Sequence, residues 1–392
     1  MPEGSTIGAR LRAARKSRGL TQEELAEAAD LSRDLIAKLE QDQRKSARLT
    51  SLVKLANALD VDLSTLVGKR DQLGTDRDGG SVLALRNVLL SPSLLPDVDD
   101  GHDGEPTPLP EITTAVRNAC SAYWNGQFST LIADLPSLIT EARLTRDALG
   151  PEATYPLAMA YDLAASLMIH LGRDDLAAIG SERAITTART GTDELLWATL
   201  HATYAWVLLH QARLQEAEQL AAGMAARIEP SFSAPTEHIA AWGNLLITAL
   251  APTAAGGGDV GDYVAMAAAG AERLRGTVRI YNSSFGPARV AEQETHAYTV
   301  LREPGKALQA SRRVHPGDLA GIAYGRHLLD VAQAHLDARH RKAATERIVE
   351  ARATSGVWFR HQVIARDLVE SIREEEARPS SAIKSLAHSL GI

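Results

Sequence analysis

The chain has 392 residues, of which 45% are hydrophobic, so its length and composition predict two or more domains with sizeable cores. Its single cysteine, Cys120, excludes an internal disulfide, and no apolar run of about 18 residues predicts a membrane span. The N-terminus lacks the apolar segment of a signal peptide, so the sequence predicts a cytoplasmic protein.

Charge is divided unevenly along the chain. Residues 1–70 contain 13 Lys and Arg against 10 Asp and Glu, whereas the net charge of the whole chain is −7. The N-terminal part therefore carries +3 and the remainder −10. A basic N-terminal part has the sign expected for a polyanion partner, and an acidic body lowers non-specific binding.

The N-terminal part encodes two helix starts in close succession. Thr21 and Glu24 have the spacing of a capping box, which predicts a helix that begins at Gln22. Asp30 falls at a turn that needs a left-handed residue, and Ser32 can cap the next helix. Apolar residues at helical spacing predict one helix upstream, with Ile7, Leu11 and Ala14. Two more are predicted downstream, the first with Leu52, Leu55, Ala56 and Leu59 and the second, a short one, with Leu63 and Leu66. Five small helices would then share one core.

Residues 5–68 resemble the Cro/CI-type helix-turn-helix domain of XRE-family transcription regulators. The resemblance rests on LTQEELA, the LS turn, the I..LE of the second helix and the following LVKLANALDVDL. In that family the second helix of the pair enters the major groove of double-stranded DNA, and its N-terminal residues reach the base edges. Asp30 and Asp42 stand where the family commonly has Gly, but Asp tolerates left-handed geometry.

The resemblance assigns DNA-contact roles by position. Gln22 would bond a phosphate and brace the recognition helix. Arg33 and Asp34 are the specificity candidates, because Arg can bond guanine bidentately and Asp can accept from the cytosine amino group. Alternatively, these side chains are solvated charges or helix caps. The implied set is Gln22, Ser32, Arg33, Asp34, Ala37, Lys38, Arg44, Lys45 and Arg48.

Residues 71–110 are predicted as a linker between the domain of residues 1–70 and a second domain of residues 111–377. SVLALRNVLL is amphipathic and predicts one short helix, either a packing element or a dimer contact. The stretch from Asp97 to Glu105 holds five acids and no Lys or Arg, with prolines on both sides. It reads as a flexible acidic spacer. Residues 378–392 would form a C-terminal tail.

The second domain contains a recurring helical hairpin. Apolar helices are joined through short polar turns at steps of roughly 36 to 46 residues, the range of helix-hairpin repeats. The turn positions are Gly126, Gly172, Ala212, Gly258, Arg302 and Ala338. These units resemble degenerate tetratricopeptide repeats, so the predicted fold class is all-α: a five-helix DNA-binding domain and an α-solenoid. RHQVIARDLVESIREEEA is predicted as its capping helix.

This domain combination resembles a class of regulators whose best-understood members are peptide-responsive quorum-sensing proteins. The Ala- and Arg-rich style is similar to that of actinobacterial regulators. The resemblance implies a homodimer on a pseudo-palindromic operator and a peptide or small-molecule effector in the concave face. The first helix of each hairpin would line that face, with candidate ligand residues Tyr161, Tyr204, Asn244, Asn282, His296, Tyr324 and Arg326.

The same residues allow other interpretations. Tyr and Trp at helical spacing usually pack between repeats, and Trp124, Trp197, Trp206, Trp242 and Trp358 are expected in the core. Asn282–Ala288 is predicted as a loop or helix start. The alternative function is an adaptor that acts through protein partners. An enzyme is disfavoured because GGGDVG lacks the Lys-Ser/Thr of a phosphate loop, and no HExxH occurs. No metal or cofactor is expected, and Cys120 is expected to be buried.

Overall fold

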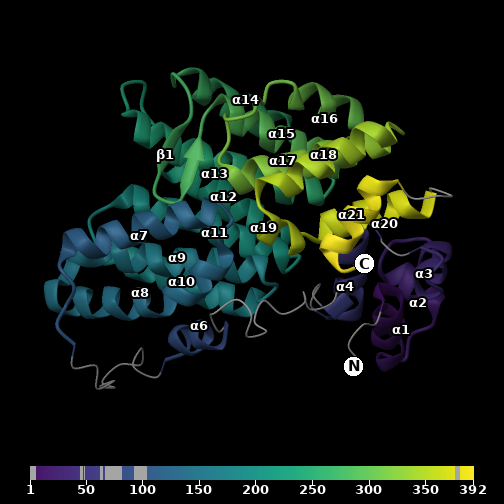
Figure 1. Cartoon of the computed structure of the whole chain (residues 1–392), viewed down its shortest axis with the longest axis horizontal. Coiled ribbons are helices and arrows are strands. Elements are labelled where there is room, and N and C mark those ends of the chain that lie inside the picture. The colour runs from purple at the N-terminus through teal and green to yellow at the C-terminus, as the bar shows by residue number, and fades with distance from the viewer. Residues whose placement is uncertain are drawn as a thin grey trace.

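The computed structural model describes residues 6–44, 47, 49–61, 65–66, 82–91, 104–375 and 380–392. Across these residues the protein is almost entirely helical, which confirms the all-α prediction (Figure 1). A small helical domain lies at one end of the molecule, and a large array of helical hairpins makes up the rest. No helix in the described ranges combines the length and apolarity needed to cross a membrane.

The N-terminal domain consists of α1 (Ile7–Ser17), α2 (Gln22–Ala28), α3 (Arg33–Glu40) and α4 (Leu49–Leu59). The predicted capping box is present: the Thr21 hydroxyl accepts from the Glu24 N–H at 3.2 Å, and the Glu24 carboxylate accepts from the Thr21 N–H at 2.7 Å. Asp30 adopts a φ of +48°, and Ser32 caps α3, as predicted. The predicted fifth helix near residues 63–66 lies largely outside the described residues.

The hairpin array places six helix pairs in succession. The pairs are α7 (Leu109–Trp124) and α8 (Phe128–Leu149), α9 (Thr154–His170) and α10 (Asp174–Arg189), α11 (Glu194–His210) and α12 (Leu214–Arg227), α13 (Thr236–Ala255) and α14 (Gly261–Glu272), α15 (Pro287–Val300) and α16 (Pro304–Ser311), and α17 (Gly321–Asp337) and α18 (Arg341–Thr354).

Every one of these pairs turns on a left-handed residue. The φ angles lie between +62° and +77° at Gly126, Gly172, Ala212, Gly257, Arg302 and Arg339. A left-handed residue directly after the helix end lets its N–H bond back to the last turn and stops the helix. The turns predicted from the sequence coincide with these residues or adjoin them.

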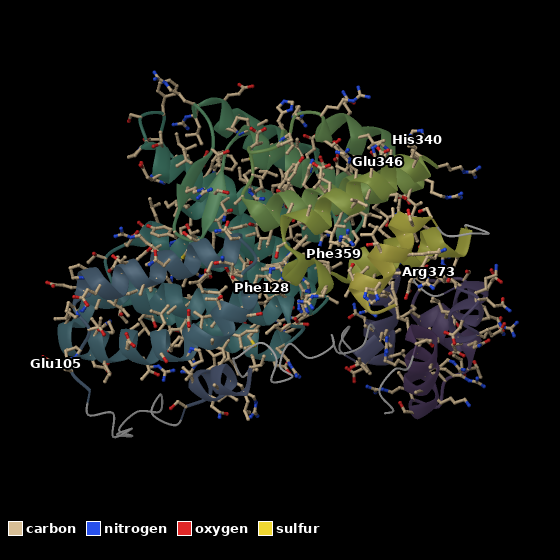
Figure 2. The ribbon with its side chains drawn as sticks, viewed as in Figure 1. Glu105, Phe128, His340, Glu346, Phe359 and Arg373 are labelled. Atoms are coloured by element: carbon tan, nitrogen blue, oxygen red, sulfur yellow. The ribbon has the colours of Figure 1, made fainter. Side chains whose placement is uncertain are left out.

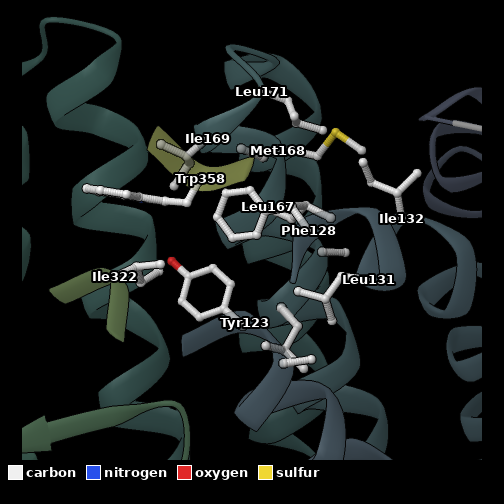
Figure 3. Close-up of a cluster of buried hydrophobic side chains, with 14 of the residues drawn as sticks. Tyr123, Phe128, Leu131, Ile132, Leu167, Met168, Ile169, Leu171, Ile322 and Trp358 are labelled. Atoms are coloured by element: carbon white, nitrogen blue, oxygen red, sulfur yellow. The ribbon is translucent and has the colours of Figure 1, made fainter. Parts of the chain in front are cut away.

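The array curls until its first hairpin meets its last. The Ser355 hydroxyl donates to the carbonyl of Gly126 at 3.2 Å, and a Cβ on Gly321 would lie 2.7 Å from the Trp124 carbonyl oxygen. Figure 3 shows the consequence: Tyr123 lies in one apolar cluster with Ile322 and Trp358. The inner helices therefore surround a common interior, and Phe128 and Phe359 (Figure 2) are fully buried within the same cluster.

A short β-hairpin interrupts the array between α14 and α15. Strands β1 (Val278–Ile280) and β2 (Ser283–Phe285) pair antiparallel, with Ile280 opposite Ser283. The helix start expected within Asn282–Ala288 occurs at Pro287, but the strand pair was not predicted. The Phe285 ring anchors it on α13, where a Cβ on Gly243 would lie 2.2 Å from the ring.

Helices outside the hairpins pack onto the main core. In α6 (Val82–Leu89), Leu85 and Leu89 are fully buried and α6 contacts α8, which favours the packing role over an open dimer contact. The array ends with α19 (Gly356–Arg360), α20 (Val363–Glu375) and α21 (Ser381–Leu390). The last of these lies in the segment predicted as a tail, yet its Ile383 and Leu386 are fully buried in the main core.

Candidate functional sites: an exposed helix and an interior cavity

The second helix of the pair, α3, is held in place by a buried carboxylate. Glu40 accepts hydrogen bonds from Arg15 at 2.6 and 2.8 Å and from the Gln22 side-chain amide at 2.8 Å. Burial by itself would raise the pKa of Glu40, but the bonds from Arg15 and Gln22 outweigh it and lower the pKa. Glu40 is therefore charged at neutral pH and ties α1 and α2 to α3. The bracing role expected of Gln22 is present in this geometry.

The outward face of α3 presents the predicted base-reading side chains to solvent. The exposed fractions of the side chains are 64% for Arg33, 70% for Asp34 and 51% for Lys38. Asp34 and Lys38 form an ion pair at 2.6 Å, and Arg33 lies 3.6 Å from Glu23. Exposed pairs of this kind are worth about 0–1 kcal/mol, so they cost little to exchange for contacts with DNA.

The other residues of the predicted DNA-contact set are placed less uniformly. The Ser32 hydroxyl accepts from the Leu35 N–H at 3.2 Å and serves as the helix cap. Ala37 is half-buried, and Arg44 is exposed just after α3. Lys45 and Arg48 lie outside the described residues.

A cavity of about 370 Å³ lies in the middle of the hairpin array. It is lined by residues of α7, α9, α11, α13, α15 and α17, together with the turn between β1 and β2 and residues of the α19 region. The first helix of each hairpin thus forms its wall, as the sequence predicted. Four of the predicted ligand residues line it, namely Asn244, Asn282, His296 and Arg326.

The three predicted tyrosines do not line the cavity. The Tyr161 hydroxyl accepts from Arg143 Nε at 2.7 Å, towards α8. Tyr204 donates to Glu182 at 3.0 Å and Tyr324 donates to Glu350 at 2.8 Å. Because successive helical residues differ by about 100° in direction, a one-residue error in phase turns a side chain out of the wall. The neighbours of the first two, Asp162 and Thr203, line the cavity instead.

Sequence reasoning missed several cavity residues. Trp358 is buried in the core as expected and Trp124 and Trp206 pack against it, but all three also contribute to the cavity wall, which was not predicted. Asp162, Arg289 and Glu292 were not singled out, although Asp162 is the lone Asp, Glu, Lys or Arg in the apolar helix α9, TYPLAMAYDLAASLMIH. A single charge inside such a helix is a signal that could have found it.

The cations of the cavity wall, within the described residues, are Arg289 and Arg326, and both have anionic partners. Arg289 pairs with Glu292 at 2.5 Å. Arg326 lies 3.3 Å from Asp330, which is also 3.1 Å from His296 Nδ1. Burial opposes ionisation of Asp330, but Arg326 and His296 outweigh it and hold its pKa well below the usual range.

Asp162 has no comparable partner. Its side chain lies in the cavity wall with the residue 3% exposed, and its Oδ2 accepts a long hydrogen bond from Asn282 Nδ2 at 3.4 Å. Burial raises the pKa of Asp162 to about 6, and hydrogen bonding from Thr203 and Asn282 offsets only part of that effect. Asp162 Oδ1, Asn282 Oδ1 and Thr199 Oγ1 are buried without a hydrogen-bond partner.

The cavity wall is connected to the N-terminal domain through α11. One face of α11 contributes Thr199, Thr203 and Trp206 to the cavity. The turn that follows α11 carries Ala212, and α12 begins at Leu214; both residues pack against the hydrophobic cluster of the N-terminal domain. The α11 helix and the turn that follows it therefore connect the cavity wall to the domain that contains α3.

Comparison with known proteins identifies the N-terminal domain. Residues 11–66 match the helix-turn-helix family. The N-terminal domain is a helix-turn-helix domain. It is similar to the immunity repressor protein of Bacillus phage phi105, with 45% identity over 64 residues. That match covers 16% of this chain and 44% of the repressor, so it spans less than half of the relative.

Two solved structures resemble about 70% of this chain, and only distantly. BtubC (BKLC) from P. vanneervenii has 14% identity and a TM-score of 0.36, over 70% of this chain and 96% of that one. Bacillus thuringiensis PlcR, in complex with the peptide PapR7 and DNA, has 13% identity and a TM-score of 0.30. That match covers 69% of this chain and 95% of the PlcR chain. Similarity at this level does not identify a function for the hairpin array.

Proposed function

We propose that the protein is a ligand-responsive transcription regulator that binds a pseudo-palindromic operator as a homodimer. The observation that carries the proposal is the recognition helix α3, which is braced through Glu40 and presents Arg33, Asp34 and Lys38 to solvent. A helix-turn-helix dimer reads two half-sites about one helical turn apart, with one such helix in each major groove.

The ligand response is supported by the cavity and by its connection to the N-terminal domain. A ligand can shift a regulator only if it binds one of two conformations more tightly than the other. The α11 helix offers a means, because a displacement of Thr199 or Trp206 would move the helix and, with it, the following turn, where Ala212 and Leu214 contact the N-terminal domain. Effector binding would then alter the position of the helix-turn-helix domain and its affinity for the operator.

The size of the cavity favours a small molecule over a peptide as the effector. Small-molecule pockets occupy about 300–1,000 Å³, and this cavity, at about 370 Å³, lies near the lower limit. The proposed effector is therefore a small signalling molecule held among the inner helices.

Selection of DNA from a random pool by the full chain tests the regulator proposal. The expected result is an enriched inverted repeat at fixed physiological salt, because salt sets the non-specific background. Arg33→Ala should reduce affinity for that repeat by about 1–3 kcal/mol and relax the preference at one position in each half-site. Lys16→Ala, which changes an exposed charge on α1, serves as the charge-matched control.

The outcome separates a regulator from an adaptor. If no motif is enriched and Arg33→Ala binds DNA as the unaltered chain does, the regulator proposal fails. In that case the adaptor interpretation gains support, and stable protein complexes of the hairpin array become its test.

A further inference from the structure

The Asp162 carboxylate is the one unbalanced charge in the described part of the cavity wall. Arg289 is engaged by Glu292, and Arg326 by Asp330. Asp162 receives only neutral hydrogen-bond donors, the amide of Asn282 and the hydroxyl of Thr203. A buried carboxylate without a cation is costly, and such groups are found where a partner or ligand completes them.

Three unpartnered acceptor atoms belong to the wall around Asp162. They are Asp162 Oδ1 on α9, Thr199 Oγ1 on α11 and Asn282 Oδ1 in the β1–β2 turn. The Asn282 amide nitrogen faces the carboxylate, which fixes its oxygen as the free acceptor. An alkylammonium group supplies one positive charge and three N–H donors, so it matches this set in both charge and donor count.

The rest of the wall is suited to an apolar or aromatic body. From Thr199 and Thr203, the same face of α11 continues to Trp206, whose ring lies against His170 with centroids 5.1 Å apart. Tyr123, Trp124 and Trp358 also line the cavity. Aromatic rings attract a nearby cation through their quadrupole and cover flat apolar groups well.

We propose that the cavity binds a small amine, with Asp162 anchoring its ammonium group and the aromatic wall holding its apolar body. This proposal names the chemical class of ligand for the effector site proposed above. Its relevance to regulation rests on that proposed function. Arg289 Nε, a buried donor without a partner, would donate to a hydroxyl or carbonyl oxygen of the ligand.

Matched probes that differ only in the head group test the proposal by calorimetry on the full chain at pH 7.5. The aromatic series is tryptamine, tryptophol and indole-3-propanoate; the aliphatic series is octylamine, octan-1-ol and octanoate. In at least one series the amine should bind about tenfold or more tightly than its alcohol, as expected for a charge-assisted contact, and the acid should bind least. Equal affinity for amine and alcohol in both series, or preference for the acid, overturns the proposal.

Two variants locate the anchor. Asp162→Asn should reduce the affinity for the amine to that for the alcohol, whereas Asp134→Asn, on the exposed surface of α8, should change nothing. Asn282→Ala, in a turn where helix packing is undisturbed, should lower the amine preference several-fold. If both cavity variants are folded and keep the amine preference, Asp162 is not the anchor and the proposal fails.

A structural role for Asp162 would give a different readout. A carboxylate that holds the fold together destabilises the protein when neutralised, whereas one left uncompensated for a ligand does not. Asp162→Asn should therefore leave the Tm unchanged or raise it in the absence of amine. A clear fall in Tm contradicts the proposal. Failure of every amine probe leaves the DNA selection untouched, so the two proposals fail separately.

Discussion

The Tyr281 hydroxyl lies 2.7 Å from both carboxylate oxygens of Asp193, a residue 88 positions away in the sequence. Asp193 also caps α11 by accepting from the Leu196 N–H at 2.9 Å. This contact fastens the β1–β2 turn, which carries Asn282, to the start of the helix that lines the cavity and reaches the N-terminal domain. The hairpin thus forms one wall of the cavity, and beside the packing of Phe285 on α13 a charge-assisted hydrogen bond fastens its turn to the start of α11.

Tyr281→Phe should loosen this wall. Because this hydrogen bond is exposed to solvent, its loss should cost about 0.5–1.5 kcal/mol, and the cost should appear as faster amide hydrogen exchange in residues 278–285 with little change elsewhere. Tyr204→Phe is the matched control, since it removes only a hydroxyl contact with Glu182 on the surface. Equal exchange rates in the two variants would show that the contact does not hold the hairpin.

The buried Asp162 makes stability depend on pH. Because burial raises its folded pKa to about 6 from the ordinary 3.8, the folded state holds the proton more tightly than the unfolded state does. Stability contributed by the protonated group is therefore lost as pH rises from about 4 through 6. Since each pH unit between the two pKa values is worth about 1.4 kcal/mol, the loss amounts to about 3 kcal/mol above pH 7.

Comparison of Asp162→Asn with the unaltered chain isolates this effect. The difference in free energy of unfolding should grow in favour of Asp162→Asn between pH 4 and pH 7 and then level off. Burial raises the pKa of neighbouring Cys120 to about 12 and also raises that of Tyr123, so neither ionises in this range. A difference that is constant with pH would contradict the raised pKa. Saturating amine should abolish the loss at pH 7 if the cavity binds it.

Local signals in the sequence were sufficient to predict the helices and turns of the helix-turn-helix domain. The capping box at Thr21 and the left-handed turn at Asp30 depend on residues within one helical turn, so spacing alone identifies them. The hairpin turns, such as Gly126 and Gly172, were predictable for the same reason. Their recurrence predicted a repeat array, and its resemblance to tetratricopeptide repeats led to the inner-helix assignment and, through it, to the cavity wall.

Features that depend on distant contacts were not predictable. The carboxylate of Asp162 and the amide of Asn282 are 120 residues apart in sequence, and the periodicity of α9 gives no face because nearly all of its residues are buried. The β1–β2 hairpin is stabilised by the packing of Phe285 on Gly243 rather than by its own three-residue strands. The order of residue types along one sequence does not show which distant residues come into contact.

Gly243→Ala should displace the hairpin from α13. An added Cβ would lie 2.2 Å from the Phe285 ring, closer than two carbon atoms can approach, so the ring and β2 must shift. We expect destabilisation of about 1–3 kcal/mol, measured by urea unfolding. Gly223→Ala, in α12 where nothing lies within 4 Å, should instead stabilise by about 0.5–1 kcal/mol. Destabilisation of the same size in both would mean that the contact with Phe285 is not its cause.

Leu214→Asp should uncouple the cavity from the helix-turn-helix domain. Leu214 packs against the hydrophobic cluster of that domain from the first residue of α12, and it is not among the residues that line the cavity. A carboxylate placed in that contact would have to be desolvated, so the domain should separate from the array. Ligand affinity, measured by calorimetry with the tightest-binding probe, should stay unchanged. Operator affinity, measured by fluorescence anisotropy, should no longer respond to that probe.

The control for this uncoupling is Leu149→Asp, which introduces the same charge at an exposed leucine on α8. It should leave the response of operator affinity intact, because Leu149 is not part of the hydrophobic cluster of the N-terminal domain. If Leu214→Asp also keeps the full response, the signal does not pass through the end of α11. The contact made by Ala212 and Leu214 would then hold the domain against the array without transmitting the effect of the ligand. The array would have to act on the operator complex in another way, through the spacing of the two subunits.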